Sequence, residues 1–237
     1  MLSQIPYWTE KLLILSWFSL NKIIIAIDGQ ASTGKSTQAK KIAKKLDFSY
    51  RDSGAYYRTI TLQLLNSKID HQIPISKRIL DNIDIKQTYK DGHFKIYLNS
   101  IDVTNKIRGQ RVSSNVSNYA KKPEIRNFVL SLLRNSANSK SLVVDGRDIG
   151  TVVFPNANFK FFLIAEPRIR AERRLKQIND KTLDVEVIER EIKLRDNTDS
   201  SRDIAPLRRA EDAFEIDVSN ISIEEVYQII LKKIKLV

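Results

Sequence analysis

The stretch "IDGQASTGKSTQAKK", residues 27–41, directly continues the apolar run "KIIIAID" of residues 22–28. This aliphatic run predicts a strand that is buried on both faces of a parallel sheet. A helix is expected over residues 35–46. Between the two, "GQASTGKS" (29–36) matches the Walker A pattern G-x-x-x-x-G-K-S. A strand, a glycine-rich turn and a helix in this order predict a phosphate-binding loop, and a purely structural glycine turn is the alternative.

The loop holds the residue types that bind a nucleoside triphosphate. Its glycines let backbone N–H groups turn towards a phosphate, and the positive end of the helix dipole lies at the same place. Lys35 offers a charge to the β- and γ-phosphates, and the Ser36 hydroxyl offers a ligand for Mg²⁺, the expected cofactor. The expected ATP-binding residues here are Gly29, Gln30, Ala31, Ser32, Thr33, Gly34, Lys35, Ser36 and Thr37.

Strand-like and helical segments alternate along the rest of the chain. Strands are expected at 47–52, 141–146, 159–165 and 213–219, and helices at 53–67, 123–137, 167–178, 184–196 and 222–235. The alternation predicts an α/β fold with a central parallel sheet covered by helices on both faces. Residues 83–103 break the pattern, because apolar and polar residues alternate there around Asp91-Gly92, a two-residue hairpin turn. A small antiparallel insert is expected in this region.

Composition and charge narrow the chemistry. The 237 residues include no cysteine and two histidines, so thiolate or histidine metal clusters and disulfides are not expected. The net charge of +12 indicates anionic ligands, and the basic excess lies within residues 35–58 and 105–147. The lysines of residues 40–45 share one predicted helix and are interpreted as a solvated face.

Residues 1–21 precede the first predicted strand and include the apolar run "LLILSWFSL" (12–20). This run is too short to span a bilayer as a helix, which needs about 20 residues. A signal peptide would also need basic residues before the run and a small-residue cleavage site after it. We interpret residues 1–21 as an extension, with targeting or an amphipathic packing arm as alternatives. A cytoplasmic protein without a membrane partner is expected, and deletion of residues 1–20 should leave its activity intact.

Two polar clusters follow predicted strands, at the edge where parallel sheets bind ligands. "DSGAYYR" (52–58) places a serine at a helix start and an arginine one turn later, and both could hold a second phosphate. "DGRDIG" (145–150) places adjacent charges after a buried run, where unpaired charges are unfavourable. A structural ion-pair network is the alternative for this second cluster. Asp28 and Asp145 are candidates to orient magnesium-bound waters, or to cap turns.

Five segments, taken in this order and spacing, resemble the bacterial cytidylate kinases. They are "IDGQASTGKST", "YRDSGAYYR", "IRGQRVSSNVSNYA", "DGRDIGTVVFPNANFKFFLIA" and "RDNTDSSRDIAPL", and the resemblance covers about residues 22–235. It implies a P-loop NTPase-type three-layer α/β/α fold with the antiparallel insert in the monophosphate-binding region and a helical lid. It also implies transfer of the γ-phosphoryl group of ATP to CMP or dCMP.

The resemblance further implies a single kinase domain over residues 22–237. Its core would comprise residues 22–58 and 140–237, the monophosphate-binding region about 59–139, and the lid about 190–208. Asp199 and Arg202 would lie on a lid loop between predicted helices, and Arg195 and Arg202 would swing over the phosphates as the lid closes. The implied catalytic residues are Lys35, Arg147, Arg195 and Arg202.

The implied CMP site combines phosphate, base and sugar contacts. Its residues are Ser53, Tyr57, Arg58, Ser117, Arg126, Arg147, Asp148, Asp199 and Arg202. In the family's pattern Ser53, Arg58 and Arg147 hold the acceptor phosphate, Ser117, Arg126 and Asp148 read the cytosine, and Asp199 and Arg202 contact the sugar. A carboxylate suits the exocyclic amino group of cytosine, which is a hydrogen-bond donor.

Three arginines on the predicted helix 167–178 share one face by their spacing. Arg174 is a further candidate for the ATP phosphates, whereas Arg170 and Arg173 are interpreted as a solvated face.

Other functions stay open from the sequence. An adenylate- or uridylate-kinase-like enzyme would share the scaffold and differ in the base pocket. A nucleic-acid-stimulated ATPase would use the basic excess, although no aromatic-studded basic groove is evident, and a non-catalytic nucleotide sensor would not need the charged residues described. We expect ATP, CMP and dCMP as partners, no nucleic acid, and a monomer.

Overall fold

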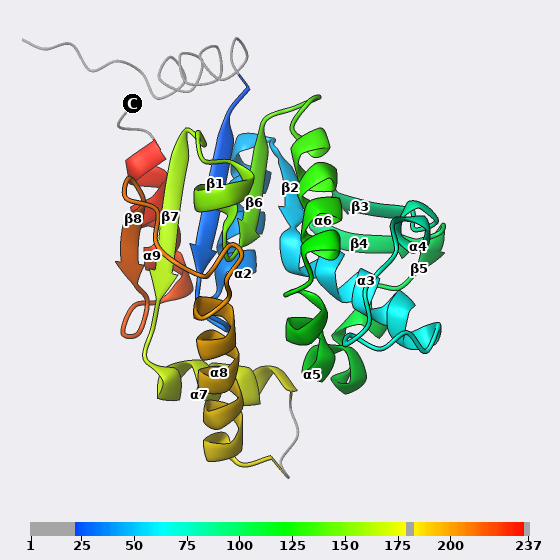
Figure 1. Ribbon diagram of the computed structural model, residues 1–237. Helices are drawn as coiled ribbons and strands as arrows, with labels where there is room; N and C mark the ends of the chain where they lie inside the picture. Colours follow the sequence, from blue (N-terminus) through cyan, green and yellow to red (C-terminus); the bar gives the residue numbers. More distant parts are fainter. Residues whose placement is uncertain (1–21, 179–182, 235–237) are drawn as a thin grey trace, which may run out of the picture.

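A computed structural model describes residues 22–178 and 183–234, and residues 1–21, the interpreted extension, lie outside this range. Five parallel strands form the central sheet in the order β2-β6-β1-β7-β8 (Figure 1). The strands are β1 (Ile24–Gly29), β2 (Ser49–Asp52), β6 (Leu142–Gly146), β7 (Phe159–Ile164) and β8 (Phe214–Asp217). Because all five are parallel, their carboxyl ends meet at one edge of the sheet.

Helices cover both faces of this sheet, as the alternation of segments predicts. Helices α2 (Lys35–Leu46) and α9 (Ile223–Ile234) pack on one face, where they meet Ile25 and Ile27 of β1. Helices α3 (Ser53–Asn66) and α6 (Pro123–Ser136) pack on the other face, where they meet Ala26. Since successive side chains of a strand point to opposite faces, the aliphatic run of β1 supplies both cores. The predicted three-layer α/β/α architecture is confirmed.

The antiparallel insert is also confirmed and projects beyond β2 (Figure 1). Its sheet has the order β3-β4-β5, from β3 (Ile85–Lys90), β4 (His93–Leu98) and β5 (Ile101–Asp102). Asp91 and Gly92 both have positive φ, at 53° and 82°, as a type I′ hairpin turn requires. The Gln87 side chain ties the insert to the end of β2, since it bonds both the N–H and the C=O of Asp52, at 3.0 and 2.8 Å.

Three short helices in this region have no counterpart among the predicted elements. They are α4 (Lys77–Asp81), the 3₁₀ turn η1 (Lys106–Arg108) and α5 (Gln110–Tyr119). The α5 sequence "QRVSSNVSNY" is rich in serine and asparagine, which have weak helix propensity. Packing against α3 stabilises it, with Val112, Val116 and Tyr119 buried.

Beyond the carboxyl ends of the strands, helices α7 (Pro167–Ile178) and α8 (Val185–Ser200) lie together (Figure 1). Helix α8 continues four residues past the predicted end at 196, so Asp199 lies on the helix, as Arg195 does, rather than in a loop. At the end of β6, residues Ile149–Val153 form a single π-helical turn, η2. Such turns are frequent at functional sites. In the described residues, no helix is long and apolar enough to cross a membrane.

Candidate active site

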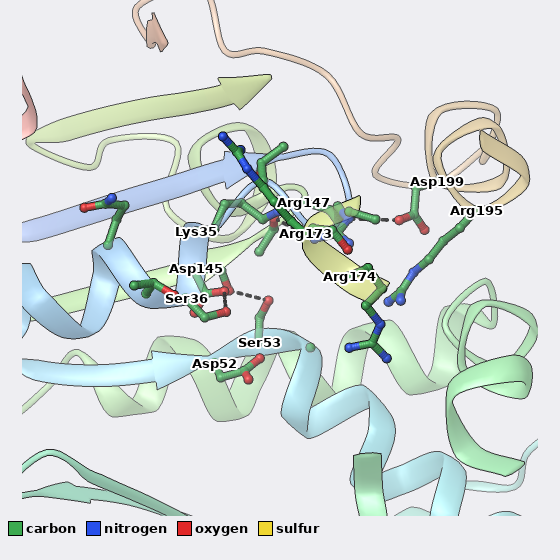
Figure 2. Close-up of a pocket in the computed structure, with 18 of the residues that line it drawn as sticks. Lys35, Ser36, Asp52, Ser53, Asp145, Arg147, Arg173, Arg174, Arg195 and Asp199 are labelled. Carbon is green, nitrogen blue, oxygen red and sulfur yellow. Dashed lines mark hydrogen bonds and ion pairs between the residues drawn. The ribbon is translucent and has the colours of Figure 1, made fainter. Parts of the chain in front are cut away.

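A cavity of about 820 Å³ opens at the carboxyl edge of the central sheet (Figure 2). Its walls come from the phosphate-binding loop, from α3 and α5, from the turn after β6, from α7 and α8, and from the segment between β8 and α9. Ligand pockets commonly have volumes of about 300–1,000 Å³. The two polar clusters predicted from the sequence lie next to each other, because Asp52 of β2 pairs with Asp145 of β6, and both line this ligand-sized space.

The phosphate-binding loop wraps closely around the end of β1. At Gly29, with φ of 143°, an added Cβ would lie 2.1 Å from the carbonyl oxygen of Leu163, so only glycine fits. The Gln30 amide donates to that oxygen at 3.3 Å, and the Ala31 amide donates to Asp196 Oδ1 at 2.9 Å. The loop amides that can meet a phosphate therefore lie between Ala31 and the first turn of α2, which begins at Lys35.

Lys35 is the buried cation of this loop. Its ammonium group donates to the carbonyl oxygen of Gln30 and to Thr33 Oγ1, the latter at 3.2 Å. Burial lowers the pKa of Lys35, and the nearby Arg147 lowers it further. A phosphate is a better partner for the ammonium group than two neutral oxygens, because its negative charge strengthens the hydrogen bonds.

Ser36 and Asp145 form a small set of oxygen atoms beside the loop. The Ser36 hydroxyl donates to Asp145 Oδ2 at 2.6 Å, and the Tyr50 hydroxyl donates to Asp145 Oδ1 at 2.7 Å. Burial raises the pKa of Asp145 to about 6, and Asp52 contributes to the rise. Magnesium is usually held by one or two protein oxygens together with substrate phosphates. The residues present fit such a site, and in the described residues no group of three or more His, Cys, Asp or Glu suits a metal ion.

Next to Asp145, the start of α3 presents Ser53 and Arg58 to the cavity. The Asp52 side chain caps this helix by accepting the Ala55 amide at 2.8 Å, and its second oxygen pairs with Arg58 Nη2 at 3.0 Å. Ser53 Oγ donates to the carbonyl oxygen of Asp145 at 2.7 Å (Figure 2). Arg58 Nε is buried and has no hydrogen-bond partner among the described residues, so this guanidinium group can still donate to an anion.

Three arginines gather around Asp199 in the same half of the cavity. Arg147 Nε pairs with one carboxylate oxygen at 2.9 Å (Figure 2), and Arg202 Nη1 lies 3.7 Å from the other. Within residues 22–178 and 183–234, the buried nitrogens of Arg195 (Nε) and Arg202 (Nε, Nη2) have no hydrogen-bond partner. Burial and the nearby Arg147 lower the pKa of Arg195 to about 10. One carboxylate cannot neutralise three guanidinium groups, so this cluster is suited to a multiply charged anion.

A second buried ion pair lies next to this cluster. Arg126 pairs with Asp148, and both side chains are about 95% buried. The Arg126 guanidinium also donates to the carbonyl oxygen of Ala120 at 3.2 Å and lies 5.5 Å from the centre of the Tyr57 ring. Asp148 and Tyr57 line the cavity, as does Ser117 on α5. This corner offers a carboxylate, an arginine, a hydroxyl and an aromatic ring, a combination that can recognise a nucleobase.

The structure brings most of the predicted site residues to this cavity. Gly29, Gln30 and Arg126 are the predicted site residues that do not line it. The Gln30 side chain instead accepts the Ala165 amide at 3.4 Å. Asp28 caps a turn, because its two oxygens accept the amides of Ile149 and Gly150 at 2.9 and 2.7 Å.

The interpretation of Arg170 and Arg173 as a solvated face is wrong. Arg170 is 1% exposed and pairs with Asp196 of α8. Arg173 is half-buried and donates to the carbonyl oxygens of Val218 and Ser219 at 2.6 and 3.2 Å. The helical spacing places these side chains on one face, but α8 and the segment after β8 cover that face. Arg174 lines the cavity, as expected (Figure 2).

Sequence reasoning missed several lining residues. Lys40 of α2 is half-buried, with its ammonium group 5.3 Å from the centre of the Phe94 ring, so it does not belong to a fully solvated face. Arg108 of η1 and the residues Val218, Ile221, Ser222 and Ile223 also line the cavity. The last four follow β8, at or just after the end of the strand predicted at 213–219, and their position at a strand end was an available signal.

A phosphate-binding loop and a buried arginine cluster, facing each other across one cavity of a parallel α/β sheet, define a P-loop kinase of small phosphorylated substrates. Comparison with known proteins gives the particular family. The chain belongs to the cytidylate kinase family, whose sequence profile matches residues 25–236. The resemblance seen in the sequence motifs is thereby confirmed.

Individual relatives agree with the family profile. The chain is 44% identical to the cytidylate kinase of Fusobacterium nucleatum, over 91% of this chain and 99% of the relative. It is 45% identical to that of Clostridium tetani, over 90% and 94%. A solved structure of an uncharacterised protein from Eubacterium ventriosum shares the fold at 17% identity, with a TM-score of 0.53 over 92% of this chain and all of that one.

Proposed function

We propose that this protein transfers the γ-phosphoryl group of ATP to CMP or dCMP and so forms ADP and CDP or dCDP. The observation that carries this proposal is the arrangement of the cavity. The phosphate-binding loop with Lys35 lies on one side, and the arginine cluster with the Arg126–Asp148 pair lies on the other. The family assignment agrees with it.

In this mechanism, an oxygen of the acceptor phosphate attacks the γ-phosphorus of ATP, and the bond to the β–γ bridging oxygen breaks as ADP leaves. The attacking phosphate is already ionised, so no general base is needed. The protein mainly aligns two anions and neutralises their repulsion. Lys35 would hold the β- and γ-phosphates, while Ser53, Arg58 and Arg147 would hold the acceptor phosphate.

The remaining arginines would complete the charge balance. Arg195 and Arg202 carry unpartnered buried nitrogens beside Arg147, and Arg174 projects from α7 into the same cavity. Preorganised charges of this kind stabilise the charge that spreads over the transferring group. We therefore infer that Lys35, Arg147, Arg195 and Arg202 are catalytic residues, and that Arg174 contacts the ATP phosphates.

Ser36 would hold Mg²⁺ together with the phosphates of ATP, and Asp145 would position Ser36 and the metal-bound waters. When bound, Mg²⁺ neutralises negative charge on the β- and γ-phosphate oxygens. The 2.6 Å bond between Ser36 and Asp145 supports this assignment, since the carboxylate fixes the hydroxyl that would become the ligand.

The Arg126–Asp148 pair would read the acceptor base, with Ser117 and Tyr57 beside it. Cytosine presents an exocyclic amino group that donates to a carboxylate, whereas uracil presents an acceptor at the same position. A buried acceptor opposite another acceptor loses its hydrogen bond, so CMP should be preferred to UMP. Asp199 and Arg202 would contact the sugar.

Partners, cellular location and oligomeric state of the enzyme follow from the same considerations. We propose nucleotides as its partners, without nucleic acid or membrane, in a cytoplasmic monomer. The basic excess supports nucleotide binding, because Lys35, Arg58 and Arg147 line the cavity.

A coupled assay with purified protein, ATP, Mg²⁺ and a panel of monophosphates tests the function. CDP and dCDP should form fastest, UDP more slowly, and little product should form from AMP or GMP. ATP consumption that is equal with and without a pyrimidine monophosphate, with no diphosphate formed, would contradict the proposal. Hydrolysis that accelerates with added RNA or DNA would instead support a nucleic-acid-stimulated ATPase.

A further inference from the structure

A buried ion pair joins α7, α8 and the phosphate-binding loop at one point. Arg170 of α7 is 1% exposed, and its Nη1 pairs with Oδ2 of Asp196 on α8. Arg170 Nε also donates to the carbonyl oxygen of Ala165 at 2.8 Å, which fixes the guanidinium group against the end of β7. Asp196 is 9% exposed.

This ion pair holds both sides of one residue of the loop. Asp196 Oδ1 accepts the Ala31 amide at 2.9 Å, and Arg170 Nη1 donates to the Ala31 carbonyl oxygen at 3.1 Å. The next residue, Ser32, has a φ of 59°, so the chain bends sharply directly after this clamp. The shape of the loop that would meet the donor phosphates therefore depends on two side chains from distant helices.

The same turn of α8 also contributes to the acceptor side of the cavity. Arg195, the neighbour of Asp196, lines the cavity, and Asp199, less than one turn later, pairs with Arg147. Removing one partner of a buried ion pair leaves an uncompensated charge, which is strongly unfavourable. This turn of α8 should therefore stay attached to the loop, and the two should shift together.

We propose that Asp196 is a positioning residue that couples the donor and acceptor subsites. When phosphates fix the loop, Asp196 fixes the turn of α8 that presents Arg195 and Asp199 to the acceptor. The acceptor should then bind more tightly when the donor site is filled, and by linkage the donor should gain the same factor. This inference rests on the function proposed above.

The test measures the dissociation constant of CMP by calorimetry, with and without a saturating β,γ-imido analogue of ATP, which cannot transfer its phosphoryl group. The ratio of the two constants is the coupling factor. For the unaltered protein it should fall in the range of about 5–150 that is typical of coupled sites. The reverse titration, of the analogue with and without CMP, should give the same factor.

Two variants and one control isolate Asp196. In Asp196→Ala, which removes both contacts, the coupling factor should fall to near one. In Asp196→Asn, which keeps an oxygen for the Ala31 amide but weakens the pairing with Arg170, it should be intermediate. Glu189→Ala is the matched control, because Glu189 lies on the same helix and pairs with Lys193 at 2.6 Å; it should leave the factor unchanged.

The outcomes separate this inference from the proposed function. A folded Asp196→Ala protein that keeps the full coupling factor overturns the inference. If that variant does not fold, the Asn variant decides, and an unchanged factor overturns the inference equally. If the unaltered protein binds both nucleotides but its coupling factor is one, the inference is also overturned, and the proposed kinase activity is not affected. Failure of the unaltered protein to bind CMP would count against the proposed function itself.

Discussion

The two halves of the cavity are built in different ways. The donor half is built mainly from one continuous loop, residues 29–37, of which residues 31–37, with the single buried lysine, line the cavity. The acceptor half is assembled from side chains on α3, α5, α8 and the turn after β6. The donor half thus depends on backbone geometry, whereas the acceptor half depends on the packing of elements far apart in the sequence.

The two halves also differ in the partners of their buried basic side chains. Lys35 is buried among neutral oxygens, and its pKa is lowered by burial and by Arg147. In the acceptor half, each of Arg58, Arg126 and Arg147 already has a carboxylate partner. Substitution of Lys35 in the donor half therefore removes a charge that has no ion-pair partner in the cavity until a phosphate binds. In the acceptor half, a substitution also disturbs a buried ion pair.

The largest effect should come from the donor half. Lys35→Ala removes the charge that would meet the β- and γ-phosphates, and loss of one preorganised group of this kind lowers turnover by about 10²–10³-fold. The measurement is steady-state formation of CDP at saturating ATP and CMP. Lys41→Ala is the control on the same helix, since Lys41 pairs with Glu224 at 2.6 Å away from the cavity. Near-normal turnover of Lys35→Ala would refute the role of this lysine.

A smaller and more selective effect is expected in the acceptor half. Asp148→Asn keeps the shape of the side chain and one oxygen for Arg126, but it places an amide donor in the base pocket. The preference for CMP over UMP should fall by a factor that corresponds to about 1–3 kcal/mol, the cost of an unpaired buried polar group. The KM for ATP should change little. Competition between CMP and UMP measures the preference, and an unchanged ratio would remove Asp148 from base recognition.

The same contrast explains which features the sequence predicts. The donor half is continuous, so the glycine spacing and the apolar run before it predicted the loop, the strand and the helix, and the fold confirms all three elements. The start of α9 is equally local, since the Ser222 amide donates to Glu225 Oε2 at 2.7 Å and the Glu225 amide donates to Ser222 Oγ at 3.2 Å, the arrangement of a capping box. Local backbone geometry can be inferred from neighbouring residues.

Features that depend on tertiary packing were harder to predict. Helical spacing placed Arg170 on a face of α7, but only the position of α8 shows that this face is covered. Helix α5 was missed because its own residues are weak helix formers, and Arg108 could not be placed beside α2 before the insert was positioned. Ser53 and Arg58 were predicted to hold a second phosphate from their place at a helix start. The residues that would read the base and the sugar were assigned through the family resemblance, since nothing in their spacing alone joins Arg126 to Asp148.

The smallest predicted effect is a change in stability with pH, and it comes from Asp28, a carboxylate that lies between the two halves of the cavity. Asp28 precedes the donor loop and accepts the amides of Ile149 and Gly150, in the turn that follows Asp148. Burial raises the pKa of Asp28 from its ordinary value of 3.8 to about 7. The Asp28 carboxyl group therefore binds its proton more tightly in the folded protein than in the unfolded chain. The stability from this group is fully present below about pH 3.8 and is lost as the pH rises towards 7.

Replacing Asp28 with asparagine should remove this dependence on pH. The free energy of unfolding of the unaltered protein, compared with that of Asp28→Asn, should fall by about 1 kcal/mol between pH 5.5 and 6.5, close to the limit for one proton. Denaturant unfolding at both pH values gives the difference. Asp91→Asn in the exposed hairpin turn is the control and should show no such change. If the difference in unfolding free energy between the unaltered protein and Asp28→Asn does not change with pH either, the Asp28 carboxylate is ionised in the folded protein at both pH values. The amides of Ile149 and Gly150 are then held by a charged carboxylate rather than by a neutral one.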